Sequence, residues 1–109
     1  MGIPPVGTVI LINFPFANLK AYKKRPAVVV AHGSLDTIIL CQITSHELPG
    51  VPGIELGKED FLEGGLSLTS YVRPDKLITV DGLAGQNYLG QLRPATAKAL
   101  RHQVAELFE

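Results

Sequence analysis

Three apolar, β-branched runs in the first half of the chain constrain its fold more than any other feature. They span residues 7–14, 27–31 and 37–44. The first shows little alternation of polar and apolar residues, which is typical of a strand covered on both faces. Connections of about ten and about five residues join the runs, and sequential strands with short connections usually lie side by side. The simplest arrangement is therefore an antiparallel meander.

Prolines separate the first run from the second, and the segment between them is strongly basic. Pro15 ends the first strand because proline cannot donate to a strand ladder. Pro26 marks the start of the second, since the residue before a proline favours extended geometry. Burying so many charges is costly, so this predicted loop is expected to face water or a polyanion. Four of the ten Lys and Arg residues lie here within six positions, with Tyr22 among them: Lys20, Lys23, Lys24 and Arg25.

The second half of the chain is predicted as short elements followed by a helix. Pro94 suits a first helical turn, and apolar residues then recur every three or four positions, at Ala97, Leu100, Val104, Leu107 and Phe108. This stripe must pack on the sheet or on a partner. Before the helix we expect a loop at 47–57 with a short strand at 54–56, followed by one or two helical turns at 58–63 that end at Gly64-Gly65. A strand at 66–73, ending at Pro74, should come next. We then expect a short strand or a bent continuation at 75–80 and a loop at 82–90.

Length and composition are those of one globular domain spanning residues 1–109. Apolar residues make up 46% and charged residues 18%, which excludes a disordered chain. No apolar run reaches the roughly 20 residues of a membrane helix, and Met1–Pro5 shows no secretory signal, so a cytoplasmic protein is expected. The fold class is mainly β with α: a small antiparallel sheet or partly open barrel with a C-terminal helix.

The sequence contains no recognisable cofactor or metal site. Zinc-type cysteine pairs and a helical His-x-x-x-His are absent, and the glycines match no phosphate-binding loop. The single cysteine, Cys41, is interpreted as a small core hydrophobe. The histidines are interpreted as structural or solvated, with more interest in His46 because it follows Thr44 by two residues. The acidic stretch 47–63 is more simply a solvated loop than a metal site or a surface for a protein partner.

A cation and a hydroxyl are expected to meet at one sheet edge. Arg25 begins the second strand and Thr44-Ser45 end the third, and in an antiparallel pair these ends are adjacent. A guanidinium offers a planar fork of donors suited to phosphate oxygens, and a threonine hydroxyl adds a short donor. Together they could stabilise charge on a phosphodiester without a metal. On spacing alone, the simpler interpretation is a solvated basic loop beside a strand-end threonine. The net charge of zero argues against nonspecific coating of nucleic acid.

Four segments, in this order, resemble the MazF/PemK family of toxins: G-T-V-I-L-I-N-F-P-F, K-K-R-P-A-V-V-V, C-Q-I-T-S and S-Y-V-R-P-D-K-L-I-T-V-D. The segment from Leu89 to Phe108 is similar to that family's closing helix, so the resemblance covers Gly7 to Phe108. It implies an SH3-like barrel with appended helices that forms a symmetric homodimer. It also implies the toxin of a type II toxin–antitoxin system, a metal-independent endoribonuclease (mRNA interferase) that cuts single-stranded RNA at short sequences and is neutralised by an antitoxin.

By position, the resemblance assigns roles to individual residues. The family's 2′-hydroxyl attacks the adjacent phosphate; Arg25 would stabilise the pentavalent phosphate and Thr44 would anchor it, with Ser45 beside them. Contacts to flanking RNA would come from Tyr22, Lys23, Lys24 and Arg73. Many members carry a glycine-rich, acidic loop before the Arg-Pro pair, whereas residues 17–24 here contain neither glycine nor carboxylate. The proton acceptor and the cleavage sequence are therefore left unassigned.

Two other functions are compatible with the same fold. One is a non-enzymatic gyrase poison like CcdB, which binds its target through the terminal helix and a nearby aromatic; Phe108 is available here, but Trp is absent. The other is a barrel that binds RNA without cutting it. RNA cleavage by the purified protein separates the nuclease from both.

Overall fold

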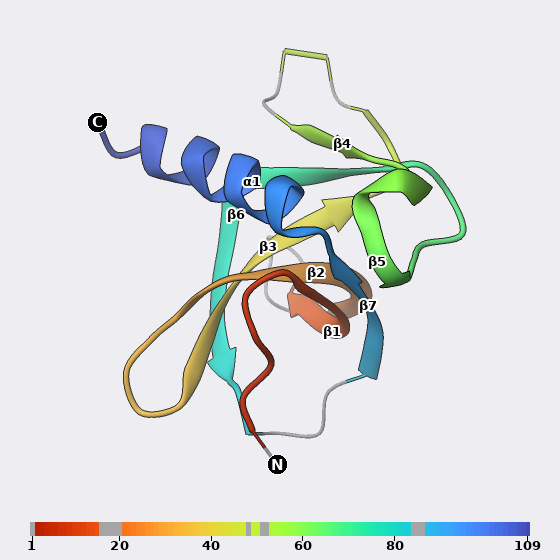
Figure 1. The fold of residues 1–109 in the computed structure, drawn as a ribbon. Helices are drawn as coiled ribbons and strands as arrows, with labels where there is room; N and C mark the ends of the chain where they lie inside the picture. The colour runs from red at the N-terminus through yellow and green to blue at the C-terminus, as the bar shows by residue number, and fades with distance from the viewer. Residues whose placement is uncertain (1, 16–20, 48, 51–52, 84–86) are drawn as a thin grey trace.

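The chain folds into a curled antiparallel sheet with one helix at its C-terminal end (Figure 1). The computed structural model describes residues 2–15, 21–47, 49–50, 53–83 and 87–109. Seven strands pair antiparallel in the order β4-β6-β3-β2-β1-β7-β5. The predicted mainly β class with a C-terminal helix is confirmed. The elements are β1 (Thr8–Pro15), β2 (Tyr22–His32), β3 (Thr37–Thr44), β4 (Ile54–Leu56), the 3₁₀ turn η1 (Lys58–Asp60), β5 (Phe61–Gly64), β6 (Ser70–Asp81), β7 (Asn87–Leu92) and α1 (Pro94–Glu106).

The first three strands form the predicted meander. Val28 of β2 lies between Val9 of β1 and Cys41 of β3, and β3 has the predicted bounds. The register shifts by a residue or more in four of the strand pairs, β1–β7, β2–β3, β3–β6 and β5–β7. Such bulges bend strands and increase their twist, which accounts for the curl of the sheet into half a barrel.

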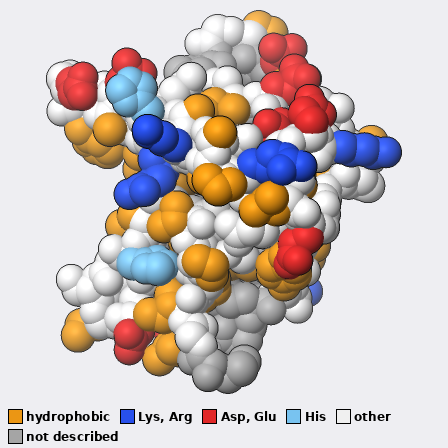
Figure 2. Space-filling view, viewed as in Figure 1, with side chains coloured by type: hydrophobic (Ala, Val, Ile, Leu, Met, Phe, Trp, Pro, Cys, Tyr) orange, Lys and Arg blue, Asp and Glu red, His pale blue; other side chains and the backbone are white. Residues whose placement is uncertain are grey.

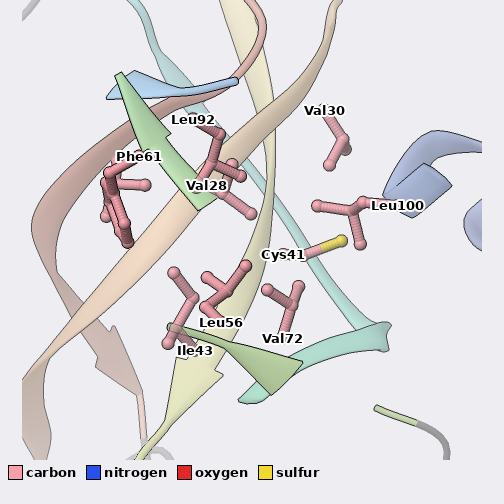
Figure 3. Packing of buried hydrophobic residues seen from close by; sticks show 10 residues of the cluster. Val28, Val30, Cys41, Ile43, Leu56, Phe61, Val72, Leu92 and Leu100 are labelled. Carbon is pink, nitrogen blue, oxygen red and sulfur yellow. The ribbon is translucent and has the colours of Figure 1, made fainter. Parts of the chain in front are cut away.

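Buried side chains form two hydrophobic clusters, and β1 contributes to both. Val9 belongs to the first and Ile10 to the second, because successive side chains of a strand point to opposite faces. β1 is therefore covered on both faces, as its lack of alternation predicts. In the first cluster, Leu100 of α1 points toward Cys41 and Val30 (Figure 3). The sheet curls around this cluster, and the helix closes one side of it.

Cys41 is fully buried in the first cluster, as predicted for a small core hydrophobe. Burial, with a smaller contribution from the carboxylate of Asp75, raises the pKa of its thiol to about 12. A thiol that stays protonated is a poor nucleophile, so Cys41 is a packing residue.

The C-terminal helix is confirmed, but its apolar stripe is shorter than predicted. Pro94 occupies the first turn, and Ala97 and Leu100 are buried. The helix ends at Glu106, so Leu107 and Phe108 lie beyond it, with 43% and 75% of their surface exposed. α1 packs on β6 and β2 with its first turns, while its far end extends away from the sheet (Figure 1). The last apolar residues therefore have no sheet surface beneath them.

The predicted basic loop is wrong for its second half, which belongs to a strand. β2 begins at Tyr22, and Lys23, Lys24 and Arg25 lie opposite Phe14, Asn13 and Ile12 of β1. Pairing the backbone with β1 leaves both lysine side chains exposed and Arg25 half-buried. A cationic segment can thus be a strand without burying its charges. Lys20 lies outside the described residues.

The segment 58–63 is also less helical than predicted. Only Lys58–Asp60 forms a single 3₁₀ turn, and Phe61–Gly64 is strand β5, paired with β7. Phe61 is buried in the first cluster, which favours the extended form. Gly64 has φ of 67°, and a Cβ there would collide with the backbone of Leu89 and Gly90. Here glycine permits close approach to β7. The short strand predicted at 54–56 is confirmed as β4.

β6 is one continuous strand that starts later and runs further than predicted. It begins at Ser70 and passes through Pro74 to Asp81. The register explains this: Val72 pairs with Ile43, and the next pair on the other side of a shift joins Leu77 to Cys41. Pro74 lies in the bulge between them, where no ladder hydrogen bond is needed from its nitrogen.

β7 was not expected, because residues 82–90 are predicted as loop. The strand Asn87–Leu92 pairs with β1 on one side and β5 on the other. Its sequence, N-Y-L-G-Q-L, has a glycine and two amides in place of a clear alternation. β7 is a strand because it pairs with β1 and β5, and strand propensity does not include such tertiary pairing.

Candidate functional site

A hollow of about 170 Å³ lies where β2 begins and β3 ends. In Figure 1, the arrowhead of β3 lies on the side of the molecule where the chain passes from β5 to β6. Three segments line the hollow: the start of β2, the end of β3, and the approach to β6. The lining residues are Lys24, Arg25, Pro26, Ile43, Thr44, Ser45, Leu66, Ser67, Leu68 and Ser70.

Strand register brings Arg25 and Thr44 to this hollow. The last paired residues of β2 and β3 at this end are Ala27 and Gln42. Continuing the same antiparallel register by two residues places Arg25 across from Thr44. Both residues are half-buried, whereas Lys24 and Ser45 are exposed. The cation and the hydroxyl predicted to meet at the sheet edge therefore share one cavity, and their role stays a prediction.

Thr44 also organises the chain that leaves β3. Its Oγ1 accepts a hydrogen bond from the backbone N–H of His46 at 3.2 Å. This turn uses the oxygen as an acceptor, so the hydroxyl proton is left to be donated elsewhere. Ser45 Oγ lies 3.3 Å from Nδ1 of His46. Threonine, serine and histidine are thus connected at the mouth of the hollow.

Sequence reasoning missed the third wall of the hollow. Leu66, Ser67, Leu68 and Ser70 come from the segment that joins β5 to β6. The hydroxyl of Ser70 donates to the carbonyl oxygen of Leu68 at 2.9 Å, which fixes this turn against the strand. The only available signal was the run of hydroxyl residues that follows Gly64-Gly65. These residues add polar and apolar surface to a cavity whose cations, Lys24 and Arg25, come from β2.

The cations at the hollow are free to bind an anion. Among the described residues, no carboxylate forms an ion pair with Lys24 or Arg25. Lys24 is exposed and Arg25 half-buried, so both positive charges lie at the solvent boundary. A guanidinium and an ammonium beside two hydroxyls form a donor set suited to a phosphate group.

Arg73 lies in a different environment, away from the lining of the hollow. Its Nε and Nη2 donate to the two carboxylate oxygens of Asp75 at 3.0 and 2.9 Å. The hydrogen bond from Arg73 lowers the pKa of the Asp75 carboxyl below its ordinary value, while partial burial opposes this effect. The bidentate pair fixes Arg73 at the bulge of β6. The structure therefore does not bring Arg73 together with Arg25 and Thr44.

The remaining predicted residues vary in how they relate to the hollow. Lys23 is exposed on β2, one residue from the lining. Tyr22 is the first residue of β2, and its side chain lies outside what the structure describes. His32 bonds the carbonyl oxygen of Pro4 through Nε2 at 2.8 Å, and His102 lies on α1 near Glu106. Only His46 of the three histidines contacts a residue of the hollow.

The acidic stretch forms a surface of its own. Acidic side chains gather over the region of β4 and η1 (Figure 2). Asp60 accepts from the backbone N–H of Gly57 at 2.8 Å and from Thr96 at 2.9 Å, so it joins η1 to α1. Within the described ranges, no group of three or more His, Cys, Asp or Glu side chains is placed to hold a metal ion. Nor does any helix there have the length and apolarity to cross a membrane.

Comparison with known families gives one match, which covers nearly the whole chain. Residues 6–108 match the family described as the PemK-like, MazF-like toxin of type II toxin–antitoxin systems. No protein of curated function matches.

Solved structures share the fold at low sequence identity. MazF from Deinococcus radiodurans superposes with a TM-score of 0.69 at 22% identity, covering 99% of this chain and 98% of that one. An endoribonuclease from a mycobacterial species has a TM-score of 0.69 at 20% identity, over 99% and 93% of the two chains. A mycobacterial endoribonuclease in complex with its cognate antitoxin has a TM-score of 0.66 at 20% identity, over 95% and 96%. The curled sheet with its helix is thus the MazF fold.

Proposed function

Because this chain belongs to the family of PemK-like, MazF-like toxins of type II toxin–antitoxin systems, we propose that it is an endoribonuclease that cuts single-stranded RNA without a metal ion. The observation that carries the proposal is the hollow at the ends of β2 and β3, where Arg25 and Thr44 meet. Its cations lack ion-pair partners among the described residues. The activity belongs in the cytoplasm, where messenger RNA is found.

Arg25 stabilises the charge that develops on the phosphate. The ribose 2′-oxygen forms a bond to phosphorus, the bond from phosphorus to the 5′-oxygen breaks, and the leaving oxygen takes up a proton. The products are a 2′,3′-cyclic phosphate and a 5′-hydroxyl. Negative charge builds on the non-bridging oxygens in the pentavalent state, and a guanidinium fork can donate to two of them. One such donor is typically worth about 3 kcal/mol of transition-state stabilisation.

Thr44 orients the same phosphate. Its oxygen already accepts from the N–H of His46, so its own proton is directed to another acceptor. A phosphate oxygen in the hollow is the acceptor that fits. Its position is reproducible, because β3 pairs with β6 up to Thr44 itself, opposite Tyr71. A donor on a paired strand loses little freedom when it binds substrate.

Other cations and an aromatic hold the flanking RNA. Lys23 and Lys24 continue the positive surface along β2 and contact neighbouring phosphates, and Ser45 contributes a hydroxyl at the mouth of the hollow. Tyr22 stacks on a base, a contact that tolerates sequence variation. Arg73 makes a weaker contact, because Asp75 already accepts from two of its nitrogens.

The protein partners follow from the family. We expect a symmetric homodimer and a cognate antitoxin that covers the RNA groove. The solved structure of a mycobacterial endoribonuclease of this fold in complex with its cognate antitoxin supports the expectation of an antitoxin. Exposed apolar residues near the C-terminus, Leu107 and Phe108, are available for such contacts.

The test is RNA cleavage by the purified protein in EDTA. Wild type should cut single-stranded RNA at defined sites, and end-mapping should give cyclic phosphate and 5′-hydroxyl termini. A substrate with a 2′-deoxy sugar at the mapped position should not be cut, and Arg25→Ala should lose about 10²- to 10³-fold of the cleavage rate. Full activity of Arg25→Ala would remove Arg25 from the mechanism. RNA binding without products, or inhibition of DNA supercoiling instead of cleavage, would contradict the nuclease and favour the alternative functions of the fold.

A further inference from the structure

The proposed reaction needs a proton acceptor that the hollow itself does not supply. The 2′-hydroxyl must lose a proton as its oxygen attacks phosphorus, and Arg25 cannot take it because a guanidinium stays protonated. Residues 17–24 carry no carboxylate. Among the described residues that line the hollow there is no Asp, Glu or His. A carboxylate or imidazole acceptor would therefore act from outside the lining.

Asp75 is poorly suited to this task. Both of its oxygens accept from Arg73, and this pairing lowers the pKa of its carboxyl. A base that is weakened and already occupied takes up a proton poorly. Asp75 and Arg73 are also absent from the residues that line the hollow.

His46 is in contact with the lining through Ser45. Its Nδ1 lies 3.3 Å from Ser45 Oγ, and its backbone N–H is bonded to Thr44 Oγ1 at 3.2 Å. The second bond fixes the turn on which the imidazole is carried. Histidine ordinarily titrates near pH ~6.5, which suits a general base at neutral pH. A hydroxyl held against an imidazole nitrogen is the arrangement by which proteins withdraw a proton from that hydroxyl.

We propose that His46, acting through the hydroxyl of Ser45, is the proton acceptor for RNA cleavage by this protein. The proposal rests on the proposed nuclease function. Ser45 lines the hollow and contacts the ribose, while His46 contacts Ser45 from outside the lining. The neutral imidazole carries its proton on Nε2, so that Nδ1 accepts from Ser45.

The step balances as a relay of one proton. Ser45 Oγ takes the proton of the 2′-hydroxyl and gives its own proton to Nδ1 of His46. The 2′-oxygen forms its bond to phosphorus, and the electron pair of the broken bond leaves with the 5′-oxygen. That oxygen is protonated by water, and the imidazolium returns its extra proton to solvent. Ser45 ends in its starting state, so no covalent intermediate forms.

The groups around His46 allow a pH profile to identify it. From β2 the hollow carries Lys24 and Arg25, Glu47 follows His46 in the chain, and Tyr71 of β6 pairs with Thr44. Lysine, arginine, glutamate and tyrosine ordinarily titrate outside the range from about pH 5 to 8, whereas histidine titrates within it. A rate that falls with acidification through this range therefore reports a histidine.

The experiment compares full-length wild type with His46→Ala, His46→Gln and Ser45→Ala, using kcat/KM for a short single-stranded RNA in EDTA at several pH values. His102→Ala is the matched control, because His102 is exposed on α1. We expect His46→Ala and His46→Gln to lose about 10²-fold in rate and the acidic limb of the profile. Ser45→Ala should lose both as well. Added imidazole should partly restore His46→Ala but not Ser45→Ala. RNA binding by the two His46 variants and the thermal unfolding midpoints of all variants should stay near those of wild type.

The outcomes separate this proposal from the nuclease assignment. If wild type cuts RNA, Arg25→Ala does not, and His46→Ala keeps the wild-type rate and pH profile, then His46 is not the acceptor and the nuclease stands. Loss of activity in His46→Ala with the acidic limb retained, or with RNA binding lost, would also overturn the relay, because His46 would then be a binding or structural residue. If wild type cuts no RNA at all, the proposed function itself fails.

Discussion

Arg25 and Arg73 lie on β2 and β6, on either side of the same end of β3, and are used in opposite ways. Arg73 is bound by Asp75 through two hydrogen bonds, and 16% of its side chain is exposed. Arg25 lines a hollow, and no described carboxylate forms an ion pair with it. Both precede a proline, and both come from strands next to β3.

The difference shows that pairing decides what an arginine can do. A guanidinium whose fork is filled by a carboxylate neutralises that charge and stabilises its strand. A guanidinium that faces a polar hollow keeps its donors for a ligand. Each is an Arg-Pro pair, but Asp75 follows the second pair whereas Ala27 follows the first, and that carboxylate is the partner of Arg73.

The largest effect is expected on catalysis. Arg25→Ala should lower the rate of RNA cleavage by about 10²- to 10³-fold, since it removes a donor to the transition state. Arg73→Ala should lower it by less than about 10-fold, because the fork of Arg73 is already filled. Single-turnover cleavage of one RNA by both variants measures this ratio. Equal losses in the two variants would remove the contrast.

The next largest loss of cleavage rate is expected from substitution of Thr44. Thr44→Val keeps the shape but loses the hydroxyl, and a hydrogen bond to a charged group is worth about 1.5–3 kcal/mol, or roughly 10- to 100-fold in rate. Thr44→Ser retains the hydroxyl and should stay close to wild type. The same single-turnover assay applies, with circular dichroism to verify folding. A Val variant as active as the Ser variant would show that the hydroxyl is not used.

A smaller effect is expected on stability, where the order of the two variants is reversed. Arg73→Ala should lower the free energy of unfolding by about 1 kcal/mol, since it removes one partner of a partly exposed bidentate pair. Arg25→Ala should change it by less than about 0.5 kcal/mol. Urea denaturation followed by circular dichroism measures both. If Arg25→Ala proved the more destabilising of the two, Arg25 would be a structural residue.

The smallest effect concerns pH. Because Arg73 lowers the pKa of Asp75 in the folded protein, the ionised pair stabilises the fold above the ordinary aspartate pKa of about 3.9. That contribution is lost as pH falls through the lowered folded-state value. Urea midpoints between about pH 6 and 3 should therefore drop more steeply for wild type than for Asp75→Asn. Parallel curves would mean that the pair contributes little.

The sequence was most informative where local patterns and tertiary structure agree. Continuous β-branched runs predicted β1 and β3, and the three- and four-residue spacing predicted α1. Chain order then placed the start of β2 beside the end of β3, so the sequence alone predicted that Arg25 and Thr44 lie close together. The third wall of the hollow could not, because Leu66 to Ser70 reach it only through the pairing of β6 with β3.

Predictions failed where partners outweigh local preference. Strand β7 has weak strand character but is paired on both sides, and β6 passes through Pro74 because a bulge frees that nitrogen. The contact between Ser45 and His46 joins adjacent residues. Even so, the sequence did not indicate which way either side chain turns.

The amino-acid sequence by itself determined the order of the central strands, the terminal helix and the family, because these depend on periodicity and on short segments in a fixed order. The tertiary structure alone decided what closes the hollow, because residues 66–70 are remote in sequence from β2 and β3 and reach them only when bulges and register bring the strands together. It also decided how neighbouring side chains turn, so that Arg73 pairs with Asp75 and His46 contacts Ser45.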